Sequence, residues 1–480
     1  MTPTYGNRPA PASDQSSVIA SHALTRITGS PLLRGNRVRL LRDARENYPA
    51  WLDAIDGAQR SIDFESYIIH EDIEGRLFVD RLINAARRGV AVRVIYDWLG
   101  GLGNASGRLW SRLRDAGVEV RCYNPFSFLS PLAWINRDHR KVLAVDGATA
   151  FVSGLCVGEM WSGAADGSVP PWRDTGIEIK GPGVREIDLS FLKIWNSIAN
   201  TEDRLVDDEQ PETHLEDIPI RVIASDPGHA RVYRLDQVLG ALARKSMWLT
   251  DAYFSATDSY VETLRAAARA GVDVKLLVPA ANDIMIMSAI ARSGYRALIE
   301  NGVRVFEWNG PMIHSKTAVI DGYWSRIGST NLNLSSFVGN AEVDILVEDV
   351  GFGAEMQEMF EQDLGNSTEI VIRNGSHIKT ADPPEGSGEG HPRHSGYAPS
   401  AVVIGSALTA AVYKGARKNL GTIEWKITST TALLLIALSL IAYRFPKSVA
   451  FPFAFVCGWL ALSLFVNAAR SIARDGDDER

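Results

Sequence analysis

A short motif that combines His, Lys and Asp occurs twice in this chain of 480 residues and constrains its fold more than any other feature. Both copies have the spacing His-x-Lys-x4-Asp, and their residues are His139, Lys141 and Asp146, then His314, Lys316 and Asp321. In each copy a pair of small residues, Ser153-Gly154 or Gly328-Ser329, begins seven residues after the Asp. One match to so short a pattern is weak, but two matches with the same flanks indicate a duplicated unit.

The segments before the two motifs also repeat. AARRGVAVRVIYD (85–97) and AARAGVDVKLLVP (267–279) align without a gap, and Gly89 and Gly271 stand where a helix would end. Each segment continues a strand, helix, strand order, which is typical of a parallel sheet covered by helices. The motifs are 175 residues apart, from His139 to His314. This period is too long for a solenoid, so we expect an α/β protein made of two repeated domains related by a pseudo-twofold axis.

Composition shifts along the chain predict the domain boundaries. The first residues are polar and rich in Pro and Ser without an apolar core, which is typical of a disordered tail and not of a secretory signal. Residues near 380 are rich in Gly, Pro and Ser, as in a linker. The expected parts are a tail (1–22), a first domain (23–205), a second domain (206–373), a linker (374–399) and a C-terminal region (400–480) with a basic helix.

Two apolar runs without charged residues, 427–443 and 449–466, occupy the C-terminal region. At 1.5 Å per residue each run would reach about 26 Å as a helix, the short end of the range for a bilayer crossing. Seven Lys and Arg residues of this region lie outside the runs and two lie in the turn between them, which predicts a transmembrane hairpin with both ends in the cytoplasm. The alternative is a buried helical hairpin in a soluble domain.

The residue types of the repeated motif suit phosphate chemistry. Lys supplies a positive charge and the Ser and Asn of the turn supply neutral donors for phosphoryl oxygens. The His lies two residues from the Lys on a strand and points to the same face. Two copies that meet would put two His and two Lys around one phosphate, where one His attacks phosphorus and the other protonates the leaving alkoxide. No acidic cluster with metal-ligand spacing accompanies the motifs, so we expect a mechanism without a metal or another cofactor.

With these motifs the chain resembles the phospholipase D superfamily and, in it, the bacterial cardiolipin synthase branch. The resemblance extends over residues 36–370 and rests on HRKVLAVD, HSKTAVID, FESYIIHEDIEG, WRDTGIEIKGP, LLVPAANDI and IGSTNLNLSSFVGNAEVDI. It implies two phospholipase D-like α/β/α sandwich domains and a covalent phosphatidyl-histidine intermediate. It also implies transfer of a phosphatidyl group from one phosphatidylglycerol to another, with release of glycerol.

The resemblance also assigns roles to single residues. The motif residues His139, Lys141, Asp146, His314, Lys316 and Asp321 are expected to be catalytic, with His139 as the nucleophile. A carboxylate about thirty residues after each His, here Asp174 and Glu342, is expected to orient the imidazole. The phosphate-binding residues would be Ser153, Gly154, Ser329 and Asn331. This chain departs from the pattern in having Cys156 where the second copy has Asn331, and its hydrophobic pair is C-terminal where the family has an N-terminal hairpin.

Several readings remain open from the sequence alone. Asp146 and Asp321 each precede a Gly after a strand, which is also an ordinary hairpin turn. Glu65 and Asp251 occupy matching places in the two repeats, either bordering the site or as buried hydrogen-bond partners. Tryptophans near the first motif are expected to pack in the core, with a lipid-facing role as the alternative.

The charge balance bears on the partners. Residues 401–480 hold nine basic and five acidic residues, so the formal charge of −7 leaves −11 for the first 400 residues. Such an acidic body disfavours nucleic acid as a partner and therefore a nuclease activity. The resemblance implies phosphatidylglycerol and membrane phospholipids as partners, and the expected location is the cytoplasmic membrane of a bacterium. Phospholipid hydrolysis, transfer to another alcohol and an inactive membrane scaffold are the remaining alternatives.

Overall fold

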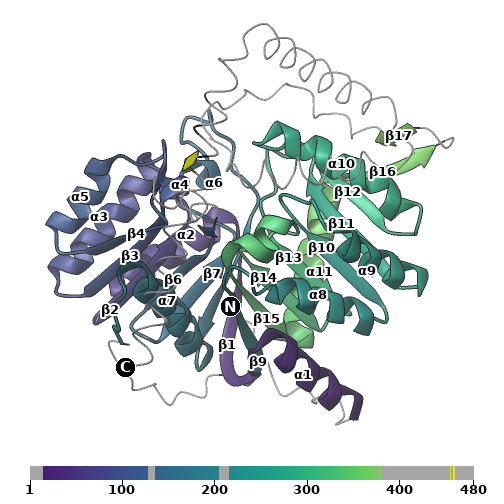
Figure 1. The fold of residues 1–480 in the computed structure, drawn as a ribbon, viewed down its shortest axis with the longest axis horizontal. Helices are drawn as coiled ribbons and strands as arrows, with labels where there is room; N and C mark the ends of the chain where they lie inside the picture. Colours follow the sequence, from purple (N-terminus) through teal and green to yellow (C-terminus); the bar gives the residue numbers. More distant parts are fainter. Residues whose placement is uncertain are drawn as a thin grey trace, which may run out of the picture.

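The chain forms two similar α/β repeats that lie side by side, the first in purple and blue and the second in teal and green in Figure 1. The computed structural model describes residues 15–127, 136–204, 216–373, 377–380, 455 and 458–459. The fold confirms the mixed α/β class and the repeated domains expected from the sequence.

The elements follow nearly the same order in both repeats. The N-terminal helix α1 (Gln15–Thr28) precedes the first repeat, which consists of β1 (Leu33–Arg42), α2 (Asp43–Gly57), β2 (Ser61–Ser66), α3 (Ile73–Arg87), β3 (Ala91–Asp97), α4 (Trp98–Gly101), α5 (Gly107–Asp115), β4 (Glu119–Tyr123), β5 (Arg137–Asp138), β6 (Lys141–Val145), β7 (Thr149–Ser153), α6 (Glu159–Ser162), β8 (Thr175–Lys180) and α7 (Gly183–Ala199).

The second repeat consists of β9 (Ile218–Ser225), α8 (Arg231–Leu242), β10 (Ser246–Thr250), α9 (Asp258–Arg269), β11 (Asp273–Pro279), α10 (Met285–Ile299), β12 (Arg304–Trp308), β13 (Thr317–Ile320), β14 (Trp324–Gly328), the π-helical turn η2 (Ser335–Gly339), β15 (Asn340–Glu348), α11 (Val350–Gly365), β16 (Ser367–Arg373) and β17 (His377–Thr380).

Strand pairing shows the duplication directly. In the first repeat β4, β3 and β2 run parallel, and β6, β7, β8 and β1 continue the sheet in antiparallel fashion. In the second repeat β12, β11 and β10 are parallel, and β13, β14, β15 and β9 follow in the same way. β1 also pairs with β9, which joins the repeats at their centre. Each sheet is therefore mixed: the parallel sheet expected from the sequence is limited to three strands, and the repeated motif supplies an antiparallel hairpin.

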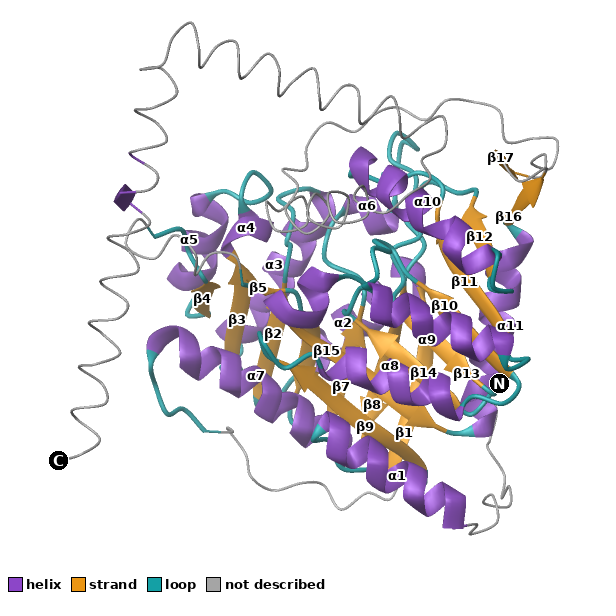
Figure 2. Ribbon diagram, turned by 45° about the vertical axis from the view of Figure 1, so that its right-hand side comes forward, coloured by secondary structure: helices purple, strands orange, loops and turns teal. Residues whose placement is uncertain are grey.

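Helices cover the strands on both faces (Figure 2). The outer face of the first repeat packs on α2, α3 and α5 around Phe64 and Phe78, and that of the second packs on α8, α9 and α10 around Tyr260. A third apolar cluster contains strands of both repeats together with α7 and α11. Burial of this shared cluster holds the repeats together, since apolar contact stabilises by about 25 cal/mol per Å² removed from water.

Two of the expected boundaries differ from the structure. Helix α1 begins at Gln15, inside the segment expected to be a disordered tail, because Leu24 packs in the core of the second repeat. The Arg221 guanidinium also donates to the hydroxyls of Ser21 (2.8 Å) and Thr25 (2.7 Å). The first part of the expected linker contains β17, which pairs with β16.

The predicted transmembrane hairpin falls on residues 427–443 and 449–466, which, apart from 455, 458 and 459, lie outside the described residues. In the part of the chain that is described, no helix has the length and apolarity needed to cross a bilayer.

Candidate active site

Each repeated motif is anchored to the main chain of the other repeat. β5 pairs in parallel with the first residues of β15, and the backbone N–H of His139 donates to the carbonyl oxygen of Ala341 at 2.9 Å. In the same way the backbone N–H of His314 donates to the carbonyl oxygen of Arg173 at 2.7 Å. Both contacts place a His beside the residue that precedes a carboxylate of the opposite repeat.

The two orienting carboxylates are consequently exchanged between the repeats. Nδ1 of His314 lies 2.8 Å from Oδ2 of Asp174, and Nδ1 of His139 lies 3.0 Å from Oε2 of Glu342. The sequence places these carboxylates about thirty residues after each His, but each one contacts the His of the other repeat. An ionised carboxylate only accepts hydrogen bonds, so Nδ1 carries the proton and the lone pair of Nε2 stays available.

Further hydrogen bonds hold both carboxylates in place. Glu342 accepts from the Ser329 hydroxyl at 2.6 Å and from the Asn340 amide at 3.2 Å. Asp174 accepts from the Trp161 indole at 3.1 Å. Although burial raises the pKa of both carboxyls, their charge interactions with the paired His and with nearby Lys bring each pKa below its usual value, so both are ionised at neutral pH.

Lys141 and Lys316 are buried beside the histidines, and each ammonium donates to the carbonyl oxygen of the His in its own motif. Burial lowers the pKa of Lys316 to about 8, with Asp174 opposing the shift and Lys141 adding to it. Because Lys141 acts electrostatically on Lys316, the two buried ammonium groups together favour an anion in their neighbourhood.

Both imidazoles are neutral at pH 7. Burial lowers the pKa of His314 to about 3, and the neighbouring Lys316 lowers it further against the effect of Asp174. Burial also lowers the pKa of His139, and Glu342 opposes this shift. Because a neutral imidazole has a free lone pair, either His is in the protonation state that a nucleophile requires.

The two histidines line a single cavity of about 80 Å³ between the repeats. Its other lining residues are Tyr67, Ile68, Arg137, Lys141, Cys156, Trp161, Trp172, Tyr253, Asp283, Ile284, Asn331, Asn333, Ser335, Ser336 and Asn340.

Aromatic rings surround the two imidazoles. The Tyr67 ring lies 5.1 Å from that of His139, and the Tyr253 ring lies 5.8 Å from that of His314. Trp161 and Trp172, expected in the core, also pack against His314, at 5.8 and 5.6 Å between ring centroids. The sequence analysis assigned no role to the two tyrosines, although their equivalent positions in the repeats were a signal that would have identified them.

Of the expected phosphate-binding residues, Asn331 lines the cavity, as does Cys156 at the matching position. The other members of this set lie behind the histidines. The Ser153 hydroxyl donates to the carbonyl oxygen of Leu155 at 3.3 Å, and the Ser329 hydroxyl is bonded to Glu342. Gly154 has a spatial role, because a Cβ at this position would lie 2.2 Å from Oδ1 of Asp174.

Asp146 and Asp321, expected with the catalytic residues, do not line the cavity. Each has a positive φ, 56° and 55°, directly after its strand. Asp146 accepts from the backbone N–H groups of residues 59, 60 and 61, and Asp321 accepts from those of residues 244, 245 and 246. The structure thus gives both residues the turn role that the sequence left open, since they tie the motif hairpin to the start of β2 or β10.

Glu65 and Asp251 lie behind the cavity wall and differ from each other. Asp251 accepts from the backbone N–H groups of Leu332 (2.8 Å) and Tyr253 (3.1 Å), and it connects two loops that border the cavity. Glu65 is fully buried, and burial together with the neighbouring Asp138 raises its pKa well above the usual value. Asp251 is therefore a hydrogen-bond partner of the loops around the site.

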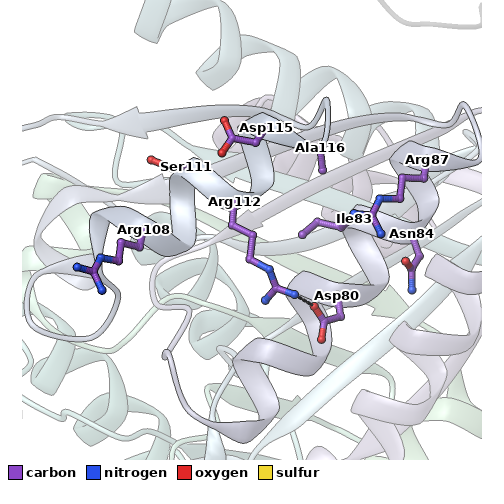
Figure 3. A pocket seen from close by; sticks show the side chains of 9 residues that line it. All are labelled: Asp80, Ile83, Asn84, Arg87, Arg108, Ser111, Arg112, Asp115 and Ala116. Carbon is purple, nitrogen blue, oxygen red and sulfur yellow. Dashed lines mark hydrogen bonds and ion pairs between the residues drawn. The ribbon is translucent and has the colours of Figure 1, made fainter.

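A larger hollow of about 610 Å³ lies on the outer surface of the first repeat, between α3 and α5 (Figure 3). It is open to solvent and lined by charged side chains, among which Asp80 and Arg112 form an ion pair. None of the motif residues reaches it, so the chemistry belongs to the smaller cavity.

The comparisons with known proteins agree with this site. The family model described as cardiolipin synthase, PLD-like domain, matches residues 51–157 and 241–364, and each match contains one motif. A cardiolipin synthase of Alkalihalophilus pseudofirmus is 32% identical over 348 residues, which cover 71% of this chain and 68% of the relative. The chain belongs to the cardiolipin synthase family of phospholipase D-like proteins.

A second relative and a solved structure extend this finding. Cardiolipin synthase A of Pseudomonas aeruginosa is 32% identical over 354 residues, which cover 73% of this chain and 71% of the relative. The crystal structure of phosphatidylserine synthase of Haemophilus influenzae has the same fold, with a TM-score of 0.54, 14% identity and coverage of 73% of this chain and 91% of the other. As a member of the family the chain is a phosphatidyltransferase of the phospholipase D superfamily.

Proposed function

We propose that the protein makes cardiolipin by moving a phosphatidyl group from one phosphatidylglycerol to the hydroxyl of another, through a phosphatidyl-histidine intermediate. The observation that carries the proposal is that His139 and His314 line one cavity together with Lys141, while Lys316 is buried beside His314. The names of the relatives support the same reaction.

In the first step His139 attacks phosphorus. Its Nε2 lone pair forms the N–P bond, and the bond between phosphorus and the oxygen of the headgroup glycerol breaks. His314 gives its Nε2 proton to this oxygen, so glycerol leaves uncharged. We assign the attack to His139 because its side chain is the more exposed of the two, at 12% against 6%.

The acid in this step must be protonated, although burial keeps His314 neutral at pH 7. A bound phosphodiester carries a negative charge and raises the pKa of an imidazole beside it. Asp174 stabilises the imidazolium in the same sense, at 2.8 Å from Nδ1. His314 therefore takes up its second proton when the substrate binds, and Lys316 and Lys141 balance the charge on the phosphoryl oxygens.

In the second step the acceptor replaces glycerol. Neutral His314 removes the proton from the hydroxyl of a second phosphatidylglycerol, whose oxygen attacks phosphorus as the N–P bond to His139 breaks. The sum is two phosphatidylglycerol molecules converted to one cardiolipin and one glycerol. His314 ends protonated, ready for the next donor.

We further propose that the protein acts at the cytoplasmic membrane, anchored by residues 427–443 and 449–466 with the two repeats in the cytoplasm. The lipid substrates and the charge-free apolar runs of the sequence support this location. Deleting residues 421–480 is then expected to move the protein into the soluble fraction, and a deletion variant that still sediments with membranes would contradict the anchor.

The reaction is tested by incubating the purified full chain with phosphatidylglycerol labelled in its acyl chains and separating the products. Cardiolipin with an equimolar amount of glycerol is the expected result. Phosphatidic acid as the sole lipid product would instead make the protein a hydrolase and overturn the proposal.

A further inference from the structure

Asp283 is a carboxylate in a cavity built to bind an anion. Among the described residues that line the cavity, it is the one acidic side chain, and Lys141 and Arg137 line the same cavity. A carboxylate repels a phosphodiester, so its presence here weakens phosphate binding and requires another explanation.

Neighbouring loops hold Asp283 in place. The Tyr253 hydroxyl donates to Oδ1 of Asp283 at 2.9 Å. The next residue toward the N-terminus, Asn282, donates to the carbonyl oxygen of Ala252 at 3.0 Å. Both contacts fasten the loop before α10 to the loop after β10, which Asp251 ties to residue 332. Such positioning is typical of a group that is preorganised for a ligand.

Asp283 does not cap the helix that follows it. The first residue of α10 is Met285, and its N-cap residue Ile284 has no side-chain cap. The backbone N–H of Ile284 is bonded to Oδ1 of Asn282 at 2.9 Å. The Asn282 side chain therefore accepts from the backbone at this turn, while Asp283 lines the cavity and accepts from the Tyr253 hydroxyl.

The first repeat has no equivalent carboxylate. Asp97 aligns with Pro279, and the residue four positions further is Gly101 in the first repeat and Asp283 in the second. Tyr67 and Tyr253 correspond, but in the described part of the chain no carboxylate accepts a hydrogen bond from the Tyr67 hydroxyl. Both repeats thus supply a His and a Tyr to the cavity, and only the second supplies a carboxylate from the described residues that line it.

The asymmetry matches a reaction whose two substrates occupy the site in turn. An ionised carboxylate offers acceptor lone pairs on two oxygens and bonds hydroxyl donors more strongly than a neutral group does. An ammonium headgroup would face the buried Lys141 and Lys316, whereas a neutral headgroup with several hydroxyls meets no like charge. We propose that Asp283, oriented by Tyr253, forms a subsite for the polyol headgroup of the acceptor. The inference rests on the proposed phosphatidyl transfer and names the acceptor's chemical class.

Competition between two acceptors tests this subsite. The purified full chain is given labelled phosphatidylglycerol at pH 7.5 with equal concentrations of labelled glycerol and ethanol. Glycerol exchanged into phosphatidylglycerol and newly formed phosphatidylethanol are measured as initial rates. Their ratio reports acceptor selectivity and cancels any loss in the first step, which both acceptors share.

Asp283→Ala is expected to lower the ratio of glycerol to ethanol transfer about tenfold or more, since a hydrogen bond to a charged group is lost for the polyol alone. Asp283→Asn, which keeps the shape of the side chain, lowers it by a smaller factor. Tyr253→Phe changes the ratio in the same direction. Tyr67→Phe is the matched control from the other repeat, and its ratio equals that of the unmodified chain.

An unchanged ratio in both Asp283 variants would overturn the subsite, as would an equal change in Tyr67→Phe. The proposed function fails on a different readout. If the unmodified chain forms phosphatidylethanol and exchanges glycerol but makes no cardiolipin, the overall reaction is wrong and the subsite stands.

Discussion

The exchange of carboxylates between the repeats makes a sharp prediction for Glu342→Gln. Glu342 accepts hydrogen bonds from His139, Ser329 and Asn340, so the substitution removes a charged acceptor from a fully buried network. A hydrogen bond to a charged group contributes about 1.5–3 kcal/mol, which lowers kcat about 10- to 150-fold. If the Gln amide donates to Nδ1 and reverses the tautomer, the loss rises to about 10⁴-fold.

The assay that separates this account from a same-repeat pairing is NMR of the imidazole nitrogens in protein labelled at His. Glu342→Gln is expected to lower the pKa of His139, because the lost carboxylate favours the imidazolium, and to leave His314 as it was. Asp174→Asn is the matched variant and is expected to act on His314. The exchange of carboxylates is refuted if Asp174→Asn lowers the pKa of His139, which lies 35 residues before it in sequence, and Glu342→Gln leaves that pKa unchanged.

Three further predictions follow from single contacts. Asp321→Ala is expected to lower the free energy of unfolding, measured in urea, by about 2–4 kcal/mol. Three backbone donors lose their acceptor, and Ala disfavours a φ of 55°. An unchanged urea midpoint would contradict this. Gly154→Ala should lower kcat about tenfold or more, because the new Cβ would lie 2.2 Å from Oδ1 of Asp174 and displace that carboxylate. Full activity would mean that the side chains around residue 154 can move without disturbing Asp174. The free energy of unfolding should fall as the pH drops from about 6.5 toward about 3. In this range His314 and His139 bind protons in the unfolded state but not in the folded state. Urea midpoints that stay constant over this range would contradict the prediction.

The repeated motif and its flanks were sufficient to predict the α/β class, the duplication and a site shared by the repeats. The aligned segment 85–97 also indicated a helix end followed by a strand, and in the structure α3 (Ile73–Arg87) ends there and β3 (Ala91–Asp97) follows. Gly89 and Gly271 follow α3 and α9 with φ of 94° and 92°, as expected of residues that end helices. These features are local, so the sequence records them directly.

The remaining features depend on contacts between distant segments. The pairing of β5 with β15 decides which carboxylate contacts which His, and the spacing of residues within one repeat does not predict this pairing. The first part of helix α1, up to residue 22, was expected to belong to a disordered tail because it is polar, but Leu24 of the same helix packs in the core of the second repeat. The aspartates of the motif share its spacing with the catalytic residues, although their side chains bind backbone donors at the opposite end of the strand.

The roles of Asp283 and Tyr253 illustrate the same limit. The segment LLVPAANDI is part of the family resemblance, yet its sequence alone does not predict that Asp283 lines the cavity. Its position follows from the Tyr253 hydroxyl and from Asn282, which join two loops that are 30 residues apart. Side chains that approach a site only through loop packing need the structure to be identified.

The central claim is that the two repeats build one active site, and it is tested most directly by covalent trapping in single-histidine variants. His314→Ala, incubated with phosphatidylglycerol, quenched and digested, is expected to accumulate phosphatidyl slowly on His139, up to one group per chain, because the acid of the first step is missing, and to release no cardiolipin. His139→Ala is expected to carry none. Label on both histidines of the unmodified chain at two groups per chain, or steady turnover by either variant, would mean that each repeat works alone and would contradict the shared site.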